Sequence, residues 1–284
     1  MDSEEKIDSQ VISDFGDEWS TYNYEKGEFS KELKLQFEMY SNLLNFQEFN
    51  PLESIAADFG AGTGRWAEFI LDNFKKVYLV EPSQGAFEVL TKKFKSKSHI
   101  SLENSTISES TIPNNSLDFA MSLGVLHHIS NTELALKDIN SKLRGGGLFL
   151  GYLYYKVENK PFLYRMIFSV ANYLRSRISN LPFKRKKRIS YLIALFVYLP
   201  FAKLTKGLNM LKINTSNIPL HQYANLSFYM MKNDALDRFG TKLEKRFNKV
   251  EIVTMLVESG FDQSSINFSE SEPFWTFTAR KLKS

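Results

Sequence analysis

A glycine-rich turn followed by an acidic residue is the feature of this sequence whose residue types and spacing could do chemistry. The turn reads Ala57-Asp58-Phe59-Gly60-Ala61-Gly62-Thr63-Gly64-Arg65-Trp66. Glycines let a backbone adopt positive φ and approach a ligand closely, and a helix N-terminus behind the turn offers free N–H groups. Glu81 comes twenty-one residues after Gly60, at the end of the next strand-like segment. A carboxylate there can accept hydrogen bonds from two ribose hydroxyls, so the pattern predicts a ribose-containing cofactor.

The glycine spacing distinguishes between the cofactors that such a turn could hold, which are NAD, FAD and S-adenosylmethionine. A dinucleotide needs G-x-G-x-x-G/A, because its pyrophosphate lies on the turn. Here the glycines read G-x-G-x-G, and Arg65 stands where the last small residue would be. The sequence therefore disfavours a dinucleotide. Taken alone, a glycine turn would also fit an ordinary loop.

Strands and helices must alternate around this turn to position it. Strand-like apolar runs lie at 54–60, 76–81, 99–103, 116–123 and 145–155, and two more follow at 264–270 and 274–281. Helical segments are expected at 30–49, 65–74, 83–95, 132–144 and 249–259, with N-caps at Ser83, Asn131 or Thr132, and Asn248. Asn50-Pro51 and Gly260 would end two of these helices. Such alternation predicts βαβ units and a parallel sheet.

Four blocks of the sequence, taken together, resemble a known family. They are ADFGAGTGRW (57–66), VEPS (80–83), SLDFAMSLGVLHHI (116–129) and LRGGGLFL (143–150). In order and spacing they are similar to class I S-adenosylmethionine-dependent methyltransferases of the small-molecule type, which includes ubiquinone and menaquinone methyltransferases and carries the type 11 methyltransferase domain. The resemblance covers roughly 52–155 and returns after Lys249. It implies an α/β fold with a Rossmann-like seven-stranded sheet of order 3-2-1-4-5-7-6, the last strand antiparallel.

The same resemblance implies the residues that bind S-adenosylmethionine. They are Asp58, Gly60, Ala61, Gly62, Gly64, Glu81, Pro82, Ser83, Ile107, Ser108, Leu123 and Gly124. The three glycines would lie along the methionine part of the cofactor with Asp58 beneath them, and Glu81 would hold the ribose. Pro82, Ser83 and the loop 107–109 would meet the adenine, with Ser108 where many relatives have Asp. Leu123 and Gly124 would line the end of the fourth strand, next to the reacting methyl.

Two adjacent histidines, His127 and His128, follow the fourth strand at the mouth of the expected pocket. Either could remove a proton from the acceptor during methyl transfer. A structural histidine that bonds a loop carbonyl is the alternative. A metal site is not expected, because the chain has four histidines and no i, i+4 pair among them.

The overall composition restricts the class of protein. The absence of cysteine excludes disulfides, cysteine zinc sites and a cysteine nucleophile. The acidic start, MDSEEKIDSQ, is unlike a signal peptide. The most apolar run, 189–204, is shorter than the ~20 residues of a spanning helix, and Pro200 interrupts it. These features predict a cytoplasmic protein without a transmembrane segment.

The segment between the fifth strand and the last helix carries an unusual charge. Thirteen Lys or Arg and one acidic residue lie between Tyr152 and Leu220, a net charge of +12 in a chain whose total is +4. Three parts are therefore expected: an N-terminal arm and helix (1–50), a methyltransferase domain (51–155 and 226–284), and a helical lid that recognises the acceptor (156–225). Phe162, Tyr164, Ile167, Phe168, Ala171 and Leu174 would form the apolar face of its first helix. Beside apolar helices, the basic residues also suit an anionic acceptor or peripheral contact with a membrane.

Three functions from different classes fit these observations. The first is an enzyme that methylates O, N or C of a small-molecule or lipid-like acceptor by direct displacement. The second is an RNA methyltransferase that uses the basic segment, although the long apolar runs there and the lack of a recognised RNA-binding module disfavour nucleic acid. The third is a protein that binds S-adenosylmethionine without turnover. Trp19 and Tyr22 could fold over the cofactor or pack as a hydrophobic staple on the edge of the sheet. His221, Tyr223 and 238–240 could line the acceptor site, but ordinary surface positions are the favoured interpretation for them.

Overall fold

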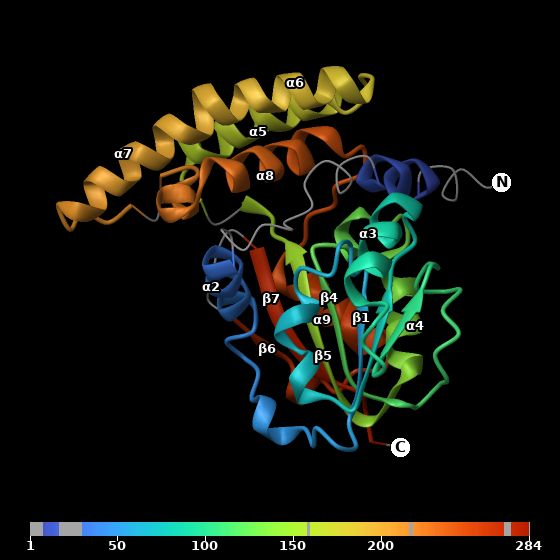
Figure 1. The fold of residues 1–284 in the computed structure, drawn as a ribbon. Helices are drawn as coiled ribbons and strands as arrows, with labels where there is room; N and C mark the ends of the chain where they lie inside the picture. The colour runs from blue at the N-terminus through green and yellow to red at the C-terminus, as the bar shows by residue number, and fades with distance from the viewer. Residues whose placement is uncertain (1–7, 17–29, 158–159, 216–217, 270–273, 284) are drawn as a thin grey trace. The chain divides into compact units, whose positions relative to one another are not determined.

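The alternating strands and helices form one seven-stranded sheet in the computed structural model (Figure 1). Its order is β3-β2-β1-β4-β5-β7-β6, as the sequence predicted. The strands are β1 Ile55–Phe59, β2 Lys76–Val80, β3 Ile100–Glu103, β4 Leu117–Leu123, β5 Leu143–Tyr154, β6 Asn267–Phe268 and β7 Phe274–Arg280. The first five are mutually parallel, and β7 is antiparallel to both β5 and β6. All five parallel strands therefore present their carboxyl ends at one edge, where ligands bind in open α/β sheets.

The structure describes residues 8–16, 30–157, 160–215, 218–269 and 274–283. They divide into two compact units, Met1–Tyr155 with Leu243–Ser284, and Lys156–Lys242. The second unit extends beyond the expected limit at residue 225, because α8 (Phe228–Gly240) shares its apolar core. The proposed role of that unit as a lid stays a prediction.

The sheet lies at the centre of the core of the first unit. Every residue of β4 is buried, which is the pattern of a parallel strand covered on both faces. On one face, α4 (Thr132–Lys142) and α9 (Lys249–Glu258) contribute Leu136, Ile139 and Leu256 to a cluster with Ala120 and Phe149 of the strands. On β4, Phe119 contacts Phe49 and Phe74, each with 5.5 Å between ring centroids.

Helix ends in the first unit agree with the sequence at two positions and differ at three. Asn131 caps α4 through its side chain, and Asn248 forms a capping box with Glu251 on α9. In contrast, α3 (Gln84–Phe94) receives no side-chain cap from Ser83. The helix expected over 30–49 is α2, Ser30–Tyr40, followed by the 3₁₀ turn Phe46–Glu48. The segment 65–74, expected to be an α-helix, forms two 3₁₀ turns, Ala67–Phe69 and Leu71–Asn73. The spacing of apolar residues did not distinguish the two, because i and i+3 lie on one side of both an α-helix and a 3₁₀-helix.

Four helices make up most of the second unit. They are α5 (Phe162–Ile178), α6 (Phe183–Ile193), α7 (Leu199–Met210) and α8, joined by the π-helical turn η7 (Ala194–Tyr198) and the 3₁₀ turn η8 (His221–Asn225). Residues Phe183–Met210 form one continuous helix of 28 residues, and this helix has the length and composition to cross a membrane. The expectation that Pro200 interrupts it was wrong. Pro200 lies at the second position after a π turn, where a missing N–H costs little.

Candidate functional site

The glycine turn begins where β1 ends and is fastened to the end of β2. The backbone N–H groups of Gly60 and Ala61 both donate to the carbonyl of Val80, at 2.8 and 3.0 Å. Gly60, Gly62 and Gly64 have φ of 78°, 57° and 74°, in the left-handed region that favours glycine. The alternating glycines therefore produce a turn that other residues would strain.

Glu81 closes this turn from the neighbouring strand. One carboxylate oxygen accepts the N–H of Gly62 and the other accepts the N–H of Ser83, both at 2.8 Å. The side chain is 6% exposed, and burial raises its pKa to about 7 against the lowering effect of the Ser83 and Gly62 N–H groups. Each oxygen keeps a second acceptor position. Glu81 can therefore hold the loop and still receive two hydroxyl groups from a ligand.

Asp58 is a second buried carboxyl, one residue before the end of β1. It is 1% exposed, and within the described residues its Oδ2 has no hydrogen-bond partner. Burial raises its pKa to about 8, the Glu81 carboxylate acts in the same direction, and Arg65 opposes both. The Thr63 hydroxyl in the same turn is also buried without a partner there. Unsatisfied buried acceptors of this kind fit a ligand that brings a donor or a positive charge.

Two of the glycines are required by protein packing as well. A Cβ on Gly60 would lie 2.4 Å from a methyl of Val125, and one on Gly64 would lie 2.2 Å from the Phe94 ring of α3. Both positions are thus filled by the protein's own side chains. Glycine at positions 60 and 64 is therefore explained by packing of the turn against Val125 and α3 as well as by a bound ligand.

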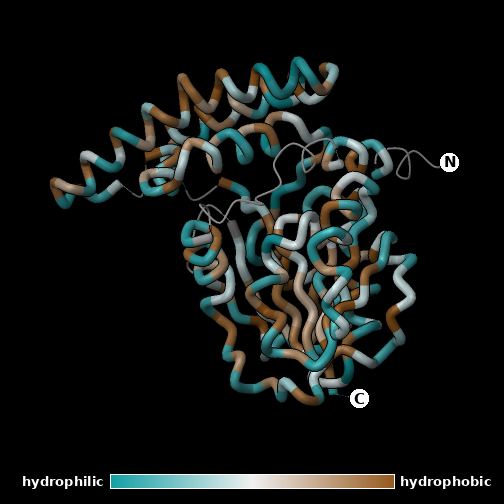
Figure 2. Tube along the Cα trace, viewed as in Figure 1, coloured by the Kyte–Doolittle hydropathy of each residue, from teal (hydrophilic) through white to brown (hydrophobic). Residues whose placement is uncertain are grey.

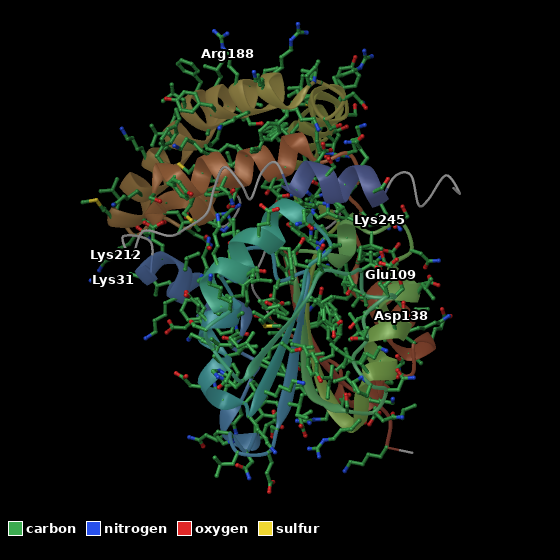
Figure 3. All side chains as sticks on the ribbon, turned by 45° about the vertical axis from the view of Figure 1, so that its right-hand side comes forward. Lys31, Glu109, Asp138, Arg188, Lys212 and Lys245 are labelled. Carbon is green, nitrogen blue, oxygen red and sulfur yellow. The ribbon has the colours of Figure 1, made fainter. Side chains whose placement is uncertain are left out.

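The segment after β3 contributes a residue that the sequence analysis missed. The Asn104 side chain donates to the carbonyls of Glu81 and Pro82, at 2.8 and 3.2 Å, and so fixes the end of β2. Its position directly after a predicted strand, at the carboxyl edge of the sheet, could have identified it from the sequence. Of the predicted adenine loop, Ile107 is buried, whereas Ser108 and Glu109 are exposed and both engage the Thr106 hydroxyl. Figure 3 shows Glu109 at the surface of the first unit.

The end of β4 adjoins the turn. Ser122 donates through its hydroxyl to the carbonyl of Phe59 at 3.0 Å, which ties β4 to the start of the turn. Leu123 is buried, and Gly124 has a φ of 83° with the Tyr152 ring of β5 3.7 Å from its Cβ position. Leu123 and Gly124 thus lie at the carboxyl end of β4, next to β1, and their predicted contact with the cofactor stays a prediction. Tyr152 and Val125 were not anticipated there.

His127 and His128 are both buried within the 3₁₀ turn Leu126–His128. Their ring centroids are 4.2 Å apart, and His127 stacks on Tyr154 at 3.8 Å. Burial, then His128, then Arg246 hold the pKa of His127 well below its usual range, so its imidazole is neutral at neutral pH. The Nδ1 of His128 lies 2.6 Å from the carbonyl oxygen of Leu243, which can only accept, so Nδ1 carries the proton. This contact matches the structural alternative for His128, and the role as base stays a prediction for both residues.

A short N-terminal helix crosses this edge of the first unit. Residues 8–16, within the predicted N-terminal arm, are helical. Asp8 accepts the N–H of Ser130 at 2.8 Å, and Phe15 meets the His128 ring edge-on at 5.1 Å. A Cβ on Gly16 would lie 2.6 Å from the Ser83 hydroxyl. The helix therefore reaches residues from the ends of both β2 and β4.

The remaining candidate residues lie elsewhere. Trp19 and Tyr22 fall outside the described residues. Tyr223 and Phe239 are buried in the core of the second unit, and so the favoured surface interpretation was wrong for them. Across the described ranges no three His, Asp or Glu side chains are grouped to hold a metal ion.

Comparisons with known proteins agree with this geometry. Residues 57–151 match the family model Methyltransf_11, a methyltransferase domain. An uncharacterized methyltransferase of Anoxybacillus flavithermus is 27% identical over 113 residues, which cover 39% of this chain and 51% of that protein. The chain thus spans about half the length of the curated relative it matches.

Solved structures show the same fold. A Burkholderia thailandensis 1,6-didemethyltoxoflavin-N1-methyltransferase with bound 1,6-didemethyltoxoflavin and S-adenosylhomocysteine superposes with a TM-score of 0.53 at 14% identity, covering 99% of this chain and 92% of that chain. An S-adenosylmethionine-dependent methyltransferase of Mesorhizobium loti gives a TM-score of 0.51 at 14% identity, covering 88% and 100%. At such low identity these structures establish the architecture only.

Proposed function

We propose, from the premise that residues 57–151 form a class I S-adenosylmethionine-dependent methyltransferase domain, that this chain transfers a methyl group to O, N or C of a small-molecule or lipid-like acceptor. The observation that carries the proposal is the pairing of the glycine turn with Glu81. The Gly62 N–H and the Glu81 carboxylate meet at 2.8 Å at the carboxyl edge of the sheet.

The charge of the site supports S-adenosylmethionine as the ligand. This cofactor carries an ammonium and a sulfonium, whereas the phosphates of a dinucleotide are anionic. Asp58 and Glu81 are buried carboxyls, and burial raises the pKa of both, with Arg65 only partly opposing the rise for Asp58. A cationic ligand would compensate for their burial and favour their ionised forms. A pyrophosphate would add further negative charge.

The chain's own residues would position and desolvate the reactants. S-adenosylmethionine supplies a methyl group that is already activated by the sulfonium. Glu81, Asn104 and the turn would fix one end of the ligand, while Gly124 and Tyr152 would bound the reacting end. Holding two reactants in line contributes much of the rate acceleration in such a displacement. His127 is buried and neutral beside Tyr154, and because its pKa is held well below its usual range it would act only as a weak base toward an acceptor hydroxyl.

Cofactor binding is tested by thermal denaturation. S-adenosylhomocysteine at about a hundredfold excess over its Kd stabilises the folded state by about 2.7 kcal/mol, which raises Tm by roughly 5–10 °C in a domain of this size. NADH should leave Tm unchanged. The assignment is falsified if NADH stabilises the protein and S-adenosylhomocysteine does not.

Glu81→Gln locates the cofactor site. It should weaken S-adenosylhomocysteine binding at least about tenfold in calorimetry, because hydrogen bonds to a charged acceptor contribute ~1.5–3 kcal/mol each. Glu88→Gln, on the exposed face of α3, is the matched control and should bind normally. Equal affinity in both well-folded variants would place the ligand elsewhere.

The acceptor class is tested with methyl-labelled S-adenosylmethionine and a cell extract separated into lipid, small-molecule and RNA fractions. Label in the lipid or small-molecule fraction supports the proposal. Label confined to RNA would replace it with an RNA methyltransferase. Binding of S-adenosylhomocysteine without label in any fraction would indicate a protein that binds the cofactor without turnover.

A further inference from the structure

Exposed apolar side chains are concentrated in the second unit. Fifteen of the twenty-two exposed large hydrophobic residues in the described ranges lie within Lys156–Lys242. Figure 2 shows hydrophobic residues recurring along α5, α6 and α7. Single exposed apolar residues are ordinary, but a contiguous set of them marks an interaction surface.

Helix α5 carries its apolar stripe on the outside. Seven of its large apolar residues are exposed: Phe162, Leu163, Met166, Ile167, Val170, Tyr173 and Leu174. Spacings of three and four place them on one face. Phe162, Ile167 and Leu174 of the predicted apolar face are therefore exposed. The inner face instead includes Arg175, whose guanidinium donates to the Thr241 carbonyl at 3.0 Å, and Phe168, which lies under the Arg238 guanidinium.

The helix Phe183–Met210 shows the same inversion. Its buried positions recur every three to four residues and are mostly small or polar: Lys186, Ser190, Ala194, Tyr198, Ala202 and Thr205. Its exposed positions include Leu192, Phe196 at 70% exposure, and Leu204. Helices α5 and α6 pack against α8, and α7 packs against η8, so these apolar faces are the ones turned away from α8 and η8. A soluble helix has the opposite arrangement.

The charge of the second unit identifies the kind of surface that it fits. Residues 156–242 contain sixteen Lys or Arg and three acidic residues, a net charge of +13, while the rest of the chain carries −9. Lys184, Arg185, Lys187 and Arg188 are exposed on the first turns of α6, next to the apolar face. Figure 3 shows Arg188 extending outward from α6. Exposed apolar residues beside exposed cations are complementary to a membrane with anionic headgroups.

We propose that the second unit docks on the surface of an anionic phospholipid membrane. The outer faces of α5 and Phe183–Met210 enter the headgroup and upper acyl region, and the cations of α6 contact the phosphates. An RNA partner would account for the exposed cations but not for the exposed apolar side chains, because Leu163, Val170 and Leu204 are aliphatic and cannot stack on bases. A second copy of the chain would bring another +13 unit against the first, which electrostatic repulsion opposes.

Docking along the surface fits the dimensions better than spanning. The uncharged stretch 189–202 is fourteen residues, about 21 Å as a helix, whereas a hydrocarbon core is about 30 Å thick. Lys203 and Lys206 follow it directly and are exposed. The partner helix α8 carries Lys232, Asp234, Asp237 and Arg238 and has 13 residues, so a spanning helix would draw charged side chains into lipid.

Flotation of the full chain with vesicles tests the proposal. The probes are phosphatidylcholine vesicles and the same vesicles with about 30% phosphatidylglycerol, since anionic lipid should dominate the attraction. We expect stronger binding to the anionic vesicles at about 0.05 M NaCl and weaker binding at about 0.5 M, because salt screens the headgroups. No binding to anionic vesicles at low salt would overturn the proposal.

A charge variant tests the role of the cations. Lys184, Arg185, Lys187 and Arg188 are changed to Gln together, while buried Lys186 is kept because its ammonium donates to the Gly240 carbonyl. Binding to anionic vesicles should fall on the order of 1,000-fold, because each of the four cations contributes ~1 kcal/mol near an anionic surface. The matched control changes four exposed cations of the first unit to Gln, namely Lys75, Lys92, Lys95 and Lys97. If the control loses vesicle binding equally, the loss depends on the total charge of the protein and not on the position of the cations, which would contradict the proposed surface.

An apolar variant tests insertion. Leu163, Val170 and Phe196 are changed to Ser together, and the matched control changes the comparably exposed Leu35, Leu52 and Val250 of the first unit to Ser. The variant should lose the binding that persists at high salt, and the control should keep it. Phe196→Trp supplies a direct reading, because brominated acyl chains should quench its fluorescence when the side chain enters lipid. Unquenched fluorescence on bound vesicles would contradict insertion.

The same variants separate the competing occupants. If the charge variant loses binding to RNA while the wild type ignores vesicles, nucleic acid is the partner. If the apolar variant turns a dimer into a monomer and vesicles are ignored, the face is an interface between copies of this chain. Retention in native membranes after carbonate extraction would indicate a spanning helix. Each of these results overturns the surface proposal.

Discussion

Strand β4 and the helix Phe183–Met210 are both rich in large apolar residues, yet they place them in opposite environments. All seven residues of β4 are buried, because strands lie on both sides of it and side chains such as Phe49, Phe74 and Leu136 cover its faces. The helix buries small and polar residues and exposes Leu192, Phe196 and Leu204. The hydropathy of each element thus indicates that something covers its apolar side chains. It does not indicate whether the covering surface belongs to the same chain.

Removing one phenyl ring from each element gives the largest expected difference in stability between the two. Phe119→Ala in β4 leaves a cavity beside Phe49 and Phe74 and should lower the free energy of unfolding by ~3–5 kcal/mol. Phe196→Ala removes the same atoms from a side chain that is 70% exposed, and should change it by less than about 0.5 kcal/mol. Urea unfolding measures both. A loss above about 2 kcal/mol for Phe196→Ala would mean that its face is covered in solution.

A second contrast uses glycine. Gly64→Ala should destabilise the protein by ~2–4 kcal/mol, because its φ is 74° and the new methyl would meet Phe94. Gly207→Ala, in α7 with nothing within 4 Å of the new atom, should stabilise the helix by up to ~1 kcal/mol. Thermal denaturation compares the two variants. If Gly64→Ala and Gly207→Ala shift Tm equally, Gly64 does not have the left-handed conformation described for the glycine turn.

The buried carboxyls give the first unit a pH dependence that the second unit should lack. The pKa of Asp58 is raised from 3.8 to about 8, so the unfolded chain ionises first as pH rises, and stability falls between about pH 4 and pH 8. Asp58→Asn removes this ionisation and should stabilise the ligand-free protein at pH 8 by a few kcal/mol, because about 1.4 kcal/mol per unit of the raised pKa outweighs the ~1–3 kcal/mol cost of a buried amide. Near pH 4 only the cost of the amide remains, so the variant should be no more stable than the wild type there.

Asp72→Asn, at an exposed position, is the control for removing one carboxyl from the first unit. A pH-independent difference for Asp58→Asn would show that Asp58 is ionised throughout.

The smallest effect separates the two sides of α6. Lys186→Met leaves the Gly240 carbonyl without its 2.9 Å donor and should cost about 1–2 kcal/mol. Lys187→Met, on the exposed side, should be nearly neutral in stability. Equal effects would contradict the orientation of the helix and with it the outward apolar face.

The sequence alone determined the sheet and the central part of the candidate site. Strand-like runs alternating with helical segments specify parallel βαβ units, and the carboxyl ends of parallel strands meet at one edge. This is why the spacing from Gly60 to Glu81 was enough to predict that the two positions meet, and they do so through the 2.8 Å bond from Gly62 to Glu81.

Tertiary structure decided what depends on distant partners. The bond between His128 and Leu243 joins residues 115 apart, and Asn104 reaches the carbonyls of Glu81 and Pro82, directly after β2, only because β2 and β3 pair in this register. In the second unit, helical spacing revealed apolar stripes but not their direction. Which face of a helix is buried depends on the elements that pack against it: α8 and η8 lie against the face of Phe183–Met210 that carries mostly small and polar residues, and Leu192, Phe196 and Leu204 stay exposed.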